Sequence, residues 1–218
     1  MEESHKTEDS KHSHEHSHST EYPGRRYKWF FTILFIPLCL FAISHYITKQ
    51  IGVRGASYIG FNIYADAARQ YRKVVFINKK DMESWYYLGY SYRMLGEYEK
   101  AVDVYKQILT LDHQNLNATH DLAMSYAMKG DYKVAIKTFR DLEKMILTTD
   151  RLNPNEKLRH HEKTIALLVT CYEKLGNLDQ ARLVIQEYLK THPNSLAMKE
   201  KLMQIGKNSV SDKGIDSE

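Results

Sequence analysis

The sequence predicts an all-α fold in which antiparallel helical hairpins stack into a short solenoid after one transmembrane helix. Three observations lead to this prediction: a residue pattern that recurs after 34 positions, a glycine at the same place in every copy, and one dense apolar block near the N-terminus. The 218 residues carry a net charge of only +4, and no stretch interleaves Lys or Arg with stacking aromatics. We therefore expect no nucleic-acid binding.

The N-terminal tail, residues 1–24, is expected to be disordered because it is almost entirely polar. Four of its histidines alternate with other residues: His12, His14, His16 and His18. Imidazoles on an unfolded chain can wrap around Zn, Ni or Cu, but no second shell holds these ligands in place. We expect weak binding of these metals and no other cofactor. The two cysteines are far apart and form no CxxC pair, so no thiolate zinc site is implied.

A transmembrane helix is predicted at residues 27–47, where positions 29–47 read WFFTILFIPLCLFAISHYI without a charged residue. A cleaved signal peptide is the competing interpretation, but the apolar run is too long and no small-x-small site follows it. Arg25, Arg26 and Lys28 precede the span and predict a cytoplasmic N-terminus. The expectation is a single-pass protein of the bacterial inner membrane with periplasmic repeats.

Beyond this segment the chain repeats itself. The first copy has the spacing W-x2-LG-x2-Y-x3-G-x-Y-x2-A-x3-Y: Trp85, Leu88, Gly89, Tyr92, Gly96, Tyr98, Ala101 and Tyr105. A shift of 34 residues places the second copy at Leu122, Ala123, Tyr126, Gly130, Tyr132, Ala135 and Phe139. The third copy has Leu168, Tyr172, Gly176, Leu178, Ala181 and Ile185, and is closed by Pro193. Together these copies resemble the tetratricopeptide repeat.

The resemblance implies hairpins in which small residues let two helices approach and a glycine ends the first helix. The expected order is: disordered tail 1–24, transmembrane helix 27–47, degenerate leading repeat 56–81, repeats at 82–115 and 116–149, insertion 150–161, third repeat 162–195, capping helix 196–205 and disordered tail 206–218. In the leading repeat the first helix falls on Gly52 and Gly55, which are poor helix residues, so this repeat is predicted to be half formed.

The glycine spacing changes from 34 residues, Gly96 to Gly130, to 46 residues, Gly130 to Gly176. Twelve residues are therefore inserted near positions 148–159. Two alternatives account for them: the helices there are longer, or an exposed loop projects with Asn153 near its tip. His160 and His161, which follow, are expected on an exposed helix start.

For function, the resemblance implies a protein or peptide ligand on the concave face, which the first helix of each hairpin lines. The positions predicted to bind it are Tyr86, Tyr90, Arg93, Met94, His120, Met124, Met128, Lys163 and Lys174. These residues give an aromatic and methionine floor, suited to adaptable apolar contacts, with a basic fringe. Where some members of the family clamp a C-terminal carboxylate, only Lys163 agrees with the required residue types, which disfavours that ligand.

The sequence contains no GxGxxG, P-loop, HExxH or nucleophile-elbow motif, so we expect no enzyme. The leading hypothesis is a membrane-anchored scaffold or assembly factor that binds partner proteins through its groove. Two alternatives remain open: a metal-handling membrane protein that uses the histidine tail, and a scaffold whose groove accepts a second copy of the chain.

Overall fold

The computed structural model describes residues 24–211, without the side chains of residues 24–32, 34 and 208–211. Every regular element in this part of the chain is an α-helix: α1 (Gly24–Gly60), α2 (Tyr64–Ile77), α3 (Met82–Met94), α4 (Tyr98–Leu111), α5 (Leu116–Lys129), α6 (Tyr132–Thr148), α7 (Pro154–Lys174), α8 (Leu178–Thr191) and α9 (Leu196–Ser211). The predicted all-α class is therefore confirmed. The predicted metal-binding histidines, His12 to His18, lie outside the described residues.

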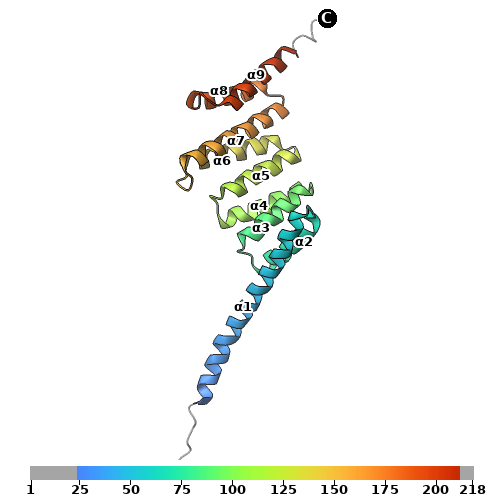
Figure 1. Ribbon diagram of the computed structural model, residues 1–218, viewed down its shortest axis with the longest axis vertical. Helices are drawn as coiled ribbons and strands as arrows, with labels where there is room; N and C mark the ends of the chain where they lie inside the picture. The colour runs from blue at the N-terminus through green and yellow to red at the C-terminus, as the bar shows by residue number, and fades with distance from the viewer. Residues whose placement is uncertain (1–23, 212–218) are drawn as a thin grey trace, which may run out of the picture. The chain divides into compact units, whose positions relative to one another are not determined.

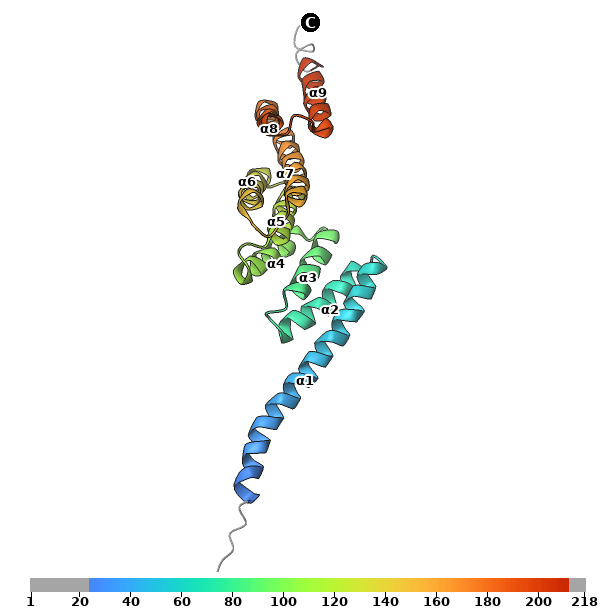
Figure 2. The same cartoon turned by 60° about the vertical axis from the view of Figure 1, so that its left-hand side comes forward.

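The helices from α2 onward stack in chain order, each packed against the next, from α2 on α3 to α8 on α9 (Figures 1 and 2). Pairs α3–α4, α5–α6 and α7–α8 are antiparallel hairpins, which is the solenoid that the 34-residue pattern predicts. The repeats belong to a compact unit that begins at Ser44. Because each hairpin contacts only its neighbours, the array is held by local packing rather than by one central core.

The ends of the repeat helices follow from particular residues. Asp81 and Asn115 cap α3 and α5, each with a side-chain oxygen that accepts from a backbone N–H of the first turn. Gly130 ends α5 with φ 94°, a left-handed conformation that costs an ordinary L-residue free energy. Gly96 and Gly176 take the same role after α3 and α7, so the glycine repeated in the sequence marks the turn inside each hairpin.

The two helices of the first hairpin approach each other closely at Gly89. A Cβ atom added there would lie 2.9 Å from the ring of Tyr105 and 3.1 Å from Val104. The same arrangement occurs one repeat earlier, where a Cβ on Gly55 would lie 2.8 Å from the ring of Tyr71. Gly52 and Gly55 are helical residues of α1, so the structure contains a first helix for the leading repeat. Tertiary packing outweighs their low helix propensity.

The extra residues of the third repeat lengthen the helices on both sides of residues 149–153. Helix α6 has 17 residues and α7 has 21, whereas α3, α4 and α5 have 13 or 14. Asn153 starts α7 with a capping box, in which its side chain and that of Glu156 each accept from the other's backbone N–H, and Pro154 occupies the first turn. Of the two alternatives, the structure has longer helices.

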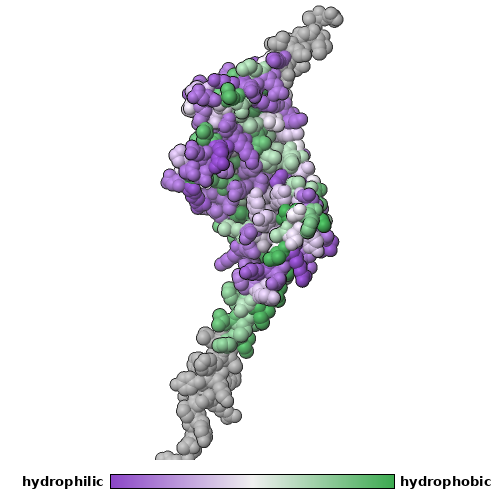
Figure 3. Space-filling view, viewed as in Figure 1, coloured by the Kyte–Doolittle hydropathy of each residue, from purple (hydrophilic) through white to green (hydrophobic). Residues whose placement is uncertain are grey.

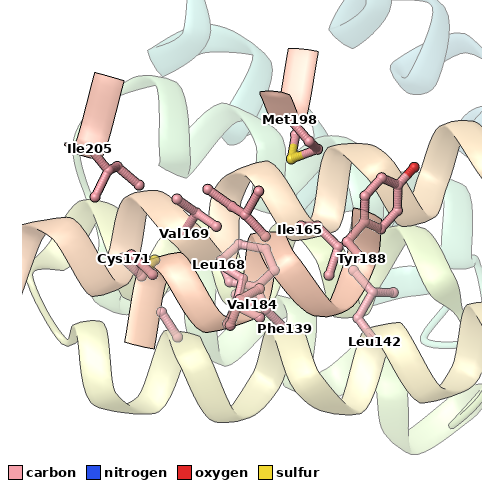
Figure 4. Close-up of a cluster of buried hydrophobic side chains, with 14 of the residues drawn as sticks. Phe139, Leu142, Ile165, Leu168, Val169, Cys171, Val184, Tyr188, Met198 and Ile205 are labelled. Atoms are coloured by element: carbon pink, nitrogen blue, oxygen red, sulfur yellow. The ribbon is translucent and has the colours of Figure 1, made fainter. Parts of the chain in front are cut away.

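The largest group of buried apolar side chains joins α6, α7, α8 and α9 (Figure 4). Phe139 from α6, Leu168 and Val169 from α7, and Ile185 from α8 are fully buried within it. Met198 and Ile205 of α9 cover its end, and both are nearly inaccessible to solvent. Helix α9 thus closes the apolar face that α8 would otherwise expose, the capping role that a terminal helix has in repeat proteins.

The predicted transmembrane helix is not supported. In the described part of the chain, no helix is long and apolar enough to cross a membrane. The described side chains of α1 are apolar as far as Ile43 and exposed (Figure 3), but Ser44 and His45 follow, and Lys49 comes soon after. A membrane span needs about 20 apolar residues. On this finding, the prediction of a single-pass inner-membrane protein is wrong. Within the predicted helix, residues 27–47, the side chains up to position 32 lie outside the described part of the chain.

We predict that the packing at Gly89 and Gly55 is needed for stability. Gly89→Ala and Gly55→Ala should each lower the free energy of unfolding by about 1–3 kcal/mol, because the rings they meet are buried and cannot move away. Gly52→Ala is the matched control: it lies in α1 with no atom within 4 Å of an added Cβ. It should stabilise by up to about 1 kcal/mol through helix propensity. Chemical denaturation measures all three, and equal effects at all three positions would contradict the packing argument.

Candidate partner-binding face

The first helices of the three hairpins line one pocket of about 370 Å³. Helix α3 contributes Tyr86 and Arg93, and α5 contributes Leu116, Asn117, His120, Asp121 and Met124. The other wall comes from α7, chiefly Lys163 and Leu167, with Leu142 of α6 beneath. The pocket therefore spans all three repeats.

Five of the nine predicted binding residues meet in this pocket: Tyr86, Arg93, His120, Met124 and Lys163. Tyr90 lies beside it, because the Arg93 guanidinium sits over its ring at 5.2 Å. Lys174 lines a separate hollow with Glu173 and Lys201. Met94 and Met128 are 43% and 46% exposed and line neither hollow. A part in binding a partner stays a prediction for all nine residues.

Asp121 is the acidic residue among those that line the pocket, and it lies outside the predicted binding set. Its side chain is only 8% exposed, and its Oδ1 lies 3.2 Å from Nδ1 of His120 and 3.9 Å from Nη2 of Arg93. Burial alone would raise the pKa of the Asp121 carboxyl, but His120, Tyr86 and Arg93 together outweigh it and hold this pKa below its ordinary value. Asp121 is therefore an ionised carboxylate inside the pocket wall.

Several polar atoms of this wall lack hydrogen-bond partners. Among the described residues, no partner has good hydrogen-bond geometry with Nε of Arg93, Nε2 of His120 or Oδ2 of Asp121, nor with the hydroxyl of Tyr105, which interacts with Arg93 from behind the lining residues. Buried polar groups in native proteins are nearly always hydrogen-bonded, so four unpaired ones in contiguous residues are unusual. No sequence pattern predicts this, because it depends on the orientations of side chains from three helices.

Aromatic side chains connect the pocket to the core of the first hairpin. The ring of Tyr86 meets that of Tyr105 edge to face at 6.2 Å, and Tyr90 meets Tyr64 of α2 in the same way at 6.0 Å. Burial, helped by the nearby Asp121 carboxylate, raises the pKa of both Tyr86 and Tyr105 well above the usual range. Both tyrosines are thus neutral at physiological pH, and they hold the α3 side of the pocket against α4.

A second polar cluster lies between α6, α7 and α8. Contrary to the prediction of an exposed helix start, His161 is buried, whereas His160 is exposed and lines the pocket. The Nε2 of His161 lies 3.1 Å from Oε1 of Glu143, and its ring meets that of Tyr188 at 5.0 Å. The physical reason is that the extended α7 packs its N-terminal turns on α6 and α8 instead of projecting from the array.

Two segments of the chain match the family model of the tetratricopeptide repeat: residues 83–115, which cover α3 and α4, and residues 167–195. The chain contains tetratricopeptide repeats. No match was found among curated proteins. Repeats are thus confirmed at two of the three predicted places, and α5 and α6 form the same kind of hairpin between them.

Solved structures share the fold at low sequence identity. A crystal structure of MamA has a TM-score of 0.55 at 19% identity, covering 72% of this chain and 81% of that one. TPR-like repeats of a putative kinesin light chain from Podosopora anserina reach 0.60 at 16% identity, with coverages of 76% and 88%. PcrH in complex with the chaperone binding region of PopD reaches 0.51 at 17% identity, with coverages of 58% and 91%. These likenesses establish the helical repeat fold.

The cluster around Glu143 should make stability depend on pH. The hydrogen bond with His161 lowers the pKa of Glu143, against the opposing effect of burial, and Arg140 at 3.1 Å lowers it further. Because the folded-state pKa is depressed, this contribution is present above the unfolded pKa of about 4.3 and is lost as pH falls through the folded value. Glu143→Gln should therefore cost about 1 kcal/mol at pH 7, and the difference from the natural chain should vanish below about pH 4.

Urea denaturation at several pH values measures this difference. Asp141→Asn is the matched control, since Asp141 is an exposed acid on the same helix. It should change the stability by less than about 0.5 kcal/mol at every pH. A cost of Glu143→Gln that does not vary with pH would show that the ionised carboxylate contributes nothing.

Proposed function

We propose that this chain is a non-enzymatic scaffold that binds a segment of a partner protein in the pocket formed by α3, α5 and α7. The observation that carries the proposal is the position of this pocket. It is built by the first helices of three successive hairpins, so that an extended segment lying across it would contact every repeat. A ligand that contacts several repeats gains binding free energy from each of them, and the repeats do not have to rearrange relative to one another.

The composition of the pocket suits such a segment. Tyr86, Leu116, Met124 and Leu167 offer apolar and aromatic surface for large side chains, and Met124 can adapt its shape to different ones. Lys163 and His160 on the opposite wall are exposed and can meet acidic groups of the partner outside the pocket. Basic residues at such a rim raise the association rate more than the final affinity.

Structures of similar fold support this kind of ligand. The solved PcrH structure contains the chaperone binding region of PopD, so a fold of this type accommodates a segment of another protein. The identity between the two chains is 17%, and the partner of this chain is therefore to be found by experiment rather than by transfer.

Site-specific photo-crosslinking tests the proposal. A benzophenone amino acid at Asn117, an exposed residue of the pocket, should capture the partner in cells, and mass spectrometry identifies it. The same group at Gln186, an exposed residue of α8 outside the pocket, is the control and should not capture that protein. If the captured protein is a second copy of this chain, the scaffold is homo-oligomeric.

We predict that two changes at exposed pocket residues abolish this capture without unfolding the chain. Lys163→Glu reverses a charge at the rim, and Asn117→Trp fills the pocket mouth. Both should leave the free energy of unfolding within about 0.5 kcal/mol, as is usual for exposed positions. Lys137→Glu on α6 and Gln186→Trp on α8 make the same chemical changes at exposed positions elsewhere and should retain capture. Undiminished capture by both pocket variants would place the partner on another face.

A further inference from the structure

The pocket contains two buried polar atoms of opposite hydrogen-bonding character. The Nε–H of Arg93 can only donate, and the Oδ2 of the ionised Asp121 can only accept. Neither atom has a partner with good hydrogen-bond geometry among the described residues, although the hydroxyls of Tyr105 and Tyr86 interact with Arg93 and Asp121, respectively. Desolvating such groups without a partner costs free energy, so a ligand group that satisfies both is favoured over one that satisfies neither.

Arg93 and Asp121 do not satisfy each other. Their closest atoms are Nη2 and Oδ1 at 3.9 Å, which is too long for a hydrogen bond. His120 approaches the same Oδ1 at 3.2 Å and leaves Oδ2 unpaired. The pair therefore has one donor and one acceptor in the same pocket that lack a partner of good geometry.

The missing partner must both accept and donate. A carboxylate could accept from Arg93, but it would place a second negative charge beside Asp121. An ammonium group could donate to Asp121, but it would face the cationic Arg93 and Lys163. A primary carboxamide has a C=O that accepts and an NH2 that donates, so it satisfies both atoms without adding charge.

We propose that this pocket binds the side-chain carboxamide of a Gln or Asn residue of the partner segment. Its C=O accepts from Nε–H of Arg93, and its NH2 donates to Oδ2 of Asp121. The proposal rests on the proposed function, since it names the chemistry that the same face selects. Leu116, Met124 and Leu167, which also line the pocket, pack against the methylene groups of the side chain.

Binding requires a local adjustment. The side chains of Arg93 and Asp121 are 14% and 8% exposed, and their unpaired atoms are closed to water. To reach the carboxamide, both side chains must turn toward it, and no hydrogen bond between them has to break because their closest atoms are 3.9 Å apart. The lysine at the rim has a separate role: Lys163 favours acidic residues elsewhere on the segment, while the inner pocket selects a neutral amide.

Three small probes test this directly on the full chain. They are the N-acetyl amides of glutamine, glutamate and norleucine, which share both backbone amide groups and differ in the side chain. The Nε–H resonance of Arg93 in a proton–nitrogen correlation spectrum reports on the unpaired donor itself. We expect the glutamine probe to shift this resonance and to bind with a Kd on the order of millimolar, as a ligand of this size allows. Its affinity should exceed that of the other two probes by about fivefold to tenfold.

Each other result overturns the proposal. Tighter binding of the glutamate probe would mean that the basic residues dominate and the pocket takes an acid. Equal binding of all three probes would assign the pocket to backbone amides. No binding of any probe at concentrations of about tens of millimolar would show that the pocket takes no such group.

Asp121→Asn provides an independent check because it removes the negative charge and keeps the shape. The glutamate probe should gain about tenfold relative to the glutamine probe, since the repulsion is gone. Lys137→Gln, at an exposed residue of α6 outside the pocket, should leave all three affinities unchanged. An unchanged preference in a folded Asp121→Asn variant overturns the proposal, and if that variant does not fold, the probe preference of the natural chain decides.

This experiment separates the inference from the proposed function. If crosslinking at Asn117 captures a partner but the probes are not distinguished, the scaffold function stands and the carboxamide assignment fails. If the glutamine probe binds but no partner is captured, the pocket chemistry stands and the scaffold function fails.

Discussion

The close approach of two helices within each hairpin is the constraint on which the array depends. Gly89 faces Tyr105, and Gly55 faces Tyr71, with no room for a Cβ atom between them. The equivalent positions in the next two repeats hold Ala123 with Phe139 and Val169 with Ile185, all fully buried. Where the side chain on the first helix is larger, the one on the second helix is smaller, so the total side-chain volume at this contact stays roughly the same. This exchange keeps the hairpin spacing similar, and it brings α3, α5 and α7 side by side.

The pocket is the consequence of that alignment, and its energetics differ from those of the core. Apolar contacts join helices α6 to α9, whereas α3 and α5 bring together a carboxylate, a guanidinium and an imidazole that only partly satisfy one another. Such groups contribute little to stability when they are buried and incompletely paired. Their presence is better understood through recognition, because an incompletely paired polar group discriminates strongly between ligands.

Much of the fold could be predicted from the sequence, because the large, small and glycine positions recur with the period of the hairpin. The leading repeat was underestimated: local propensity at Gly55 counts against a helix, but the facing Tyr71 needs a residue without a side chain there. The apolar composition near the N-terminus predicts a membrane-spanning helix, which the described part of the chain does not contain. For the site, spacing identified five pocket residues. It gave no binding role to Asp121 and did not separate Met124 from Met128, since both depend on how helices of different repeats pack.

Packing and recognition depend largely on different side chains, which explains how a fold of this kind can be shared at 16–19% identity. Stability resides in contacts between the small and large positions, which tolerate exchange as long as volume is kept. Recognition resides in side chains at the edge of this core, and the exposed ones, such as Asn117 and Lys163, can change without loss of the fold. Tyr105 connects the two, because its ring is fully buried in the core while its hydroxyl interacts with Arg93 and Asp121 of the pocket. A change at Tyr105 would therefore alter both properties at once, and this residue links the ligand to the packing of the first hairpin.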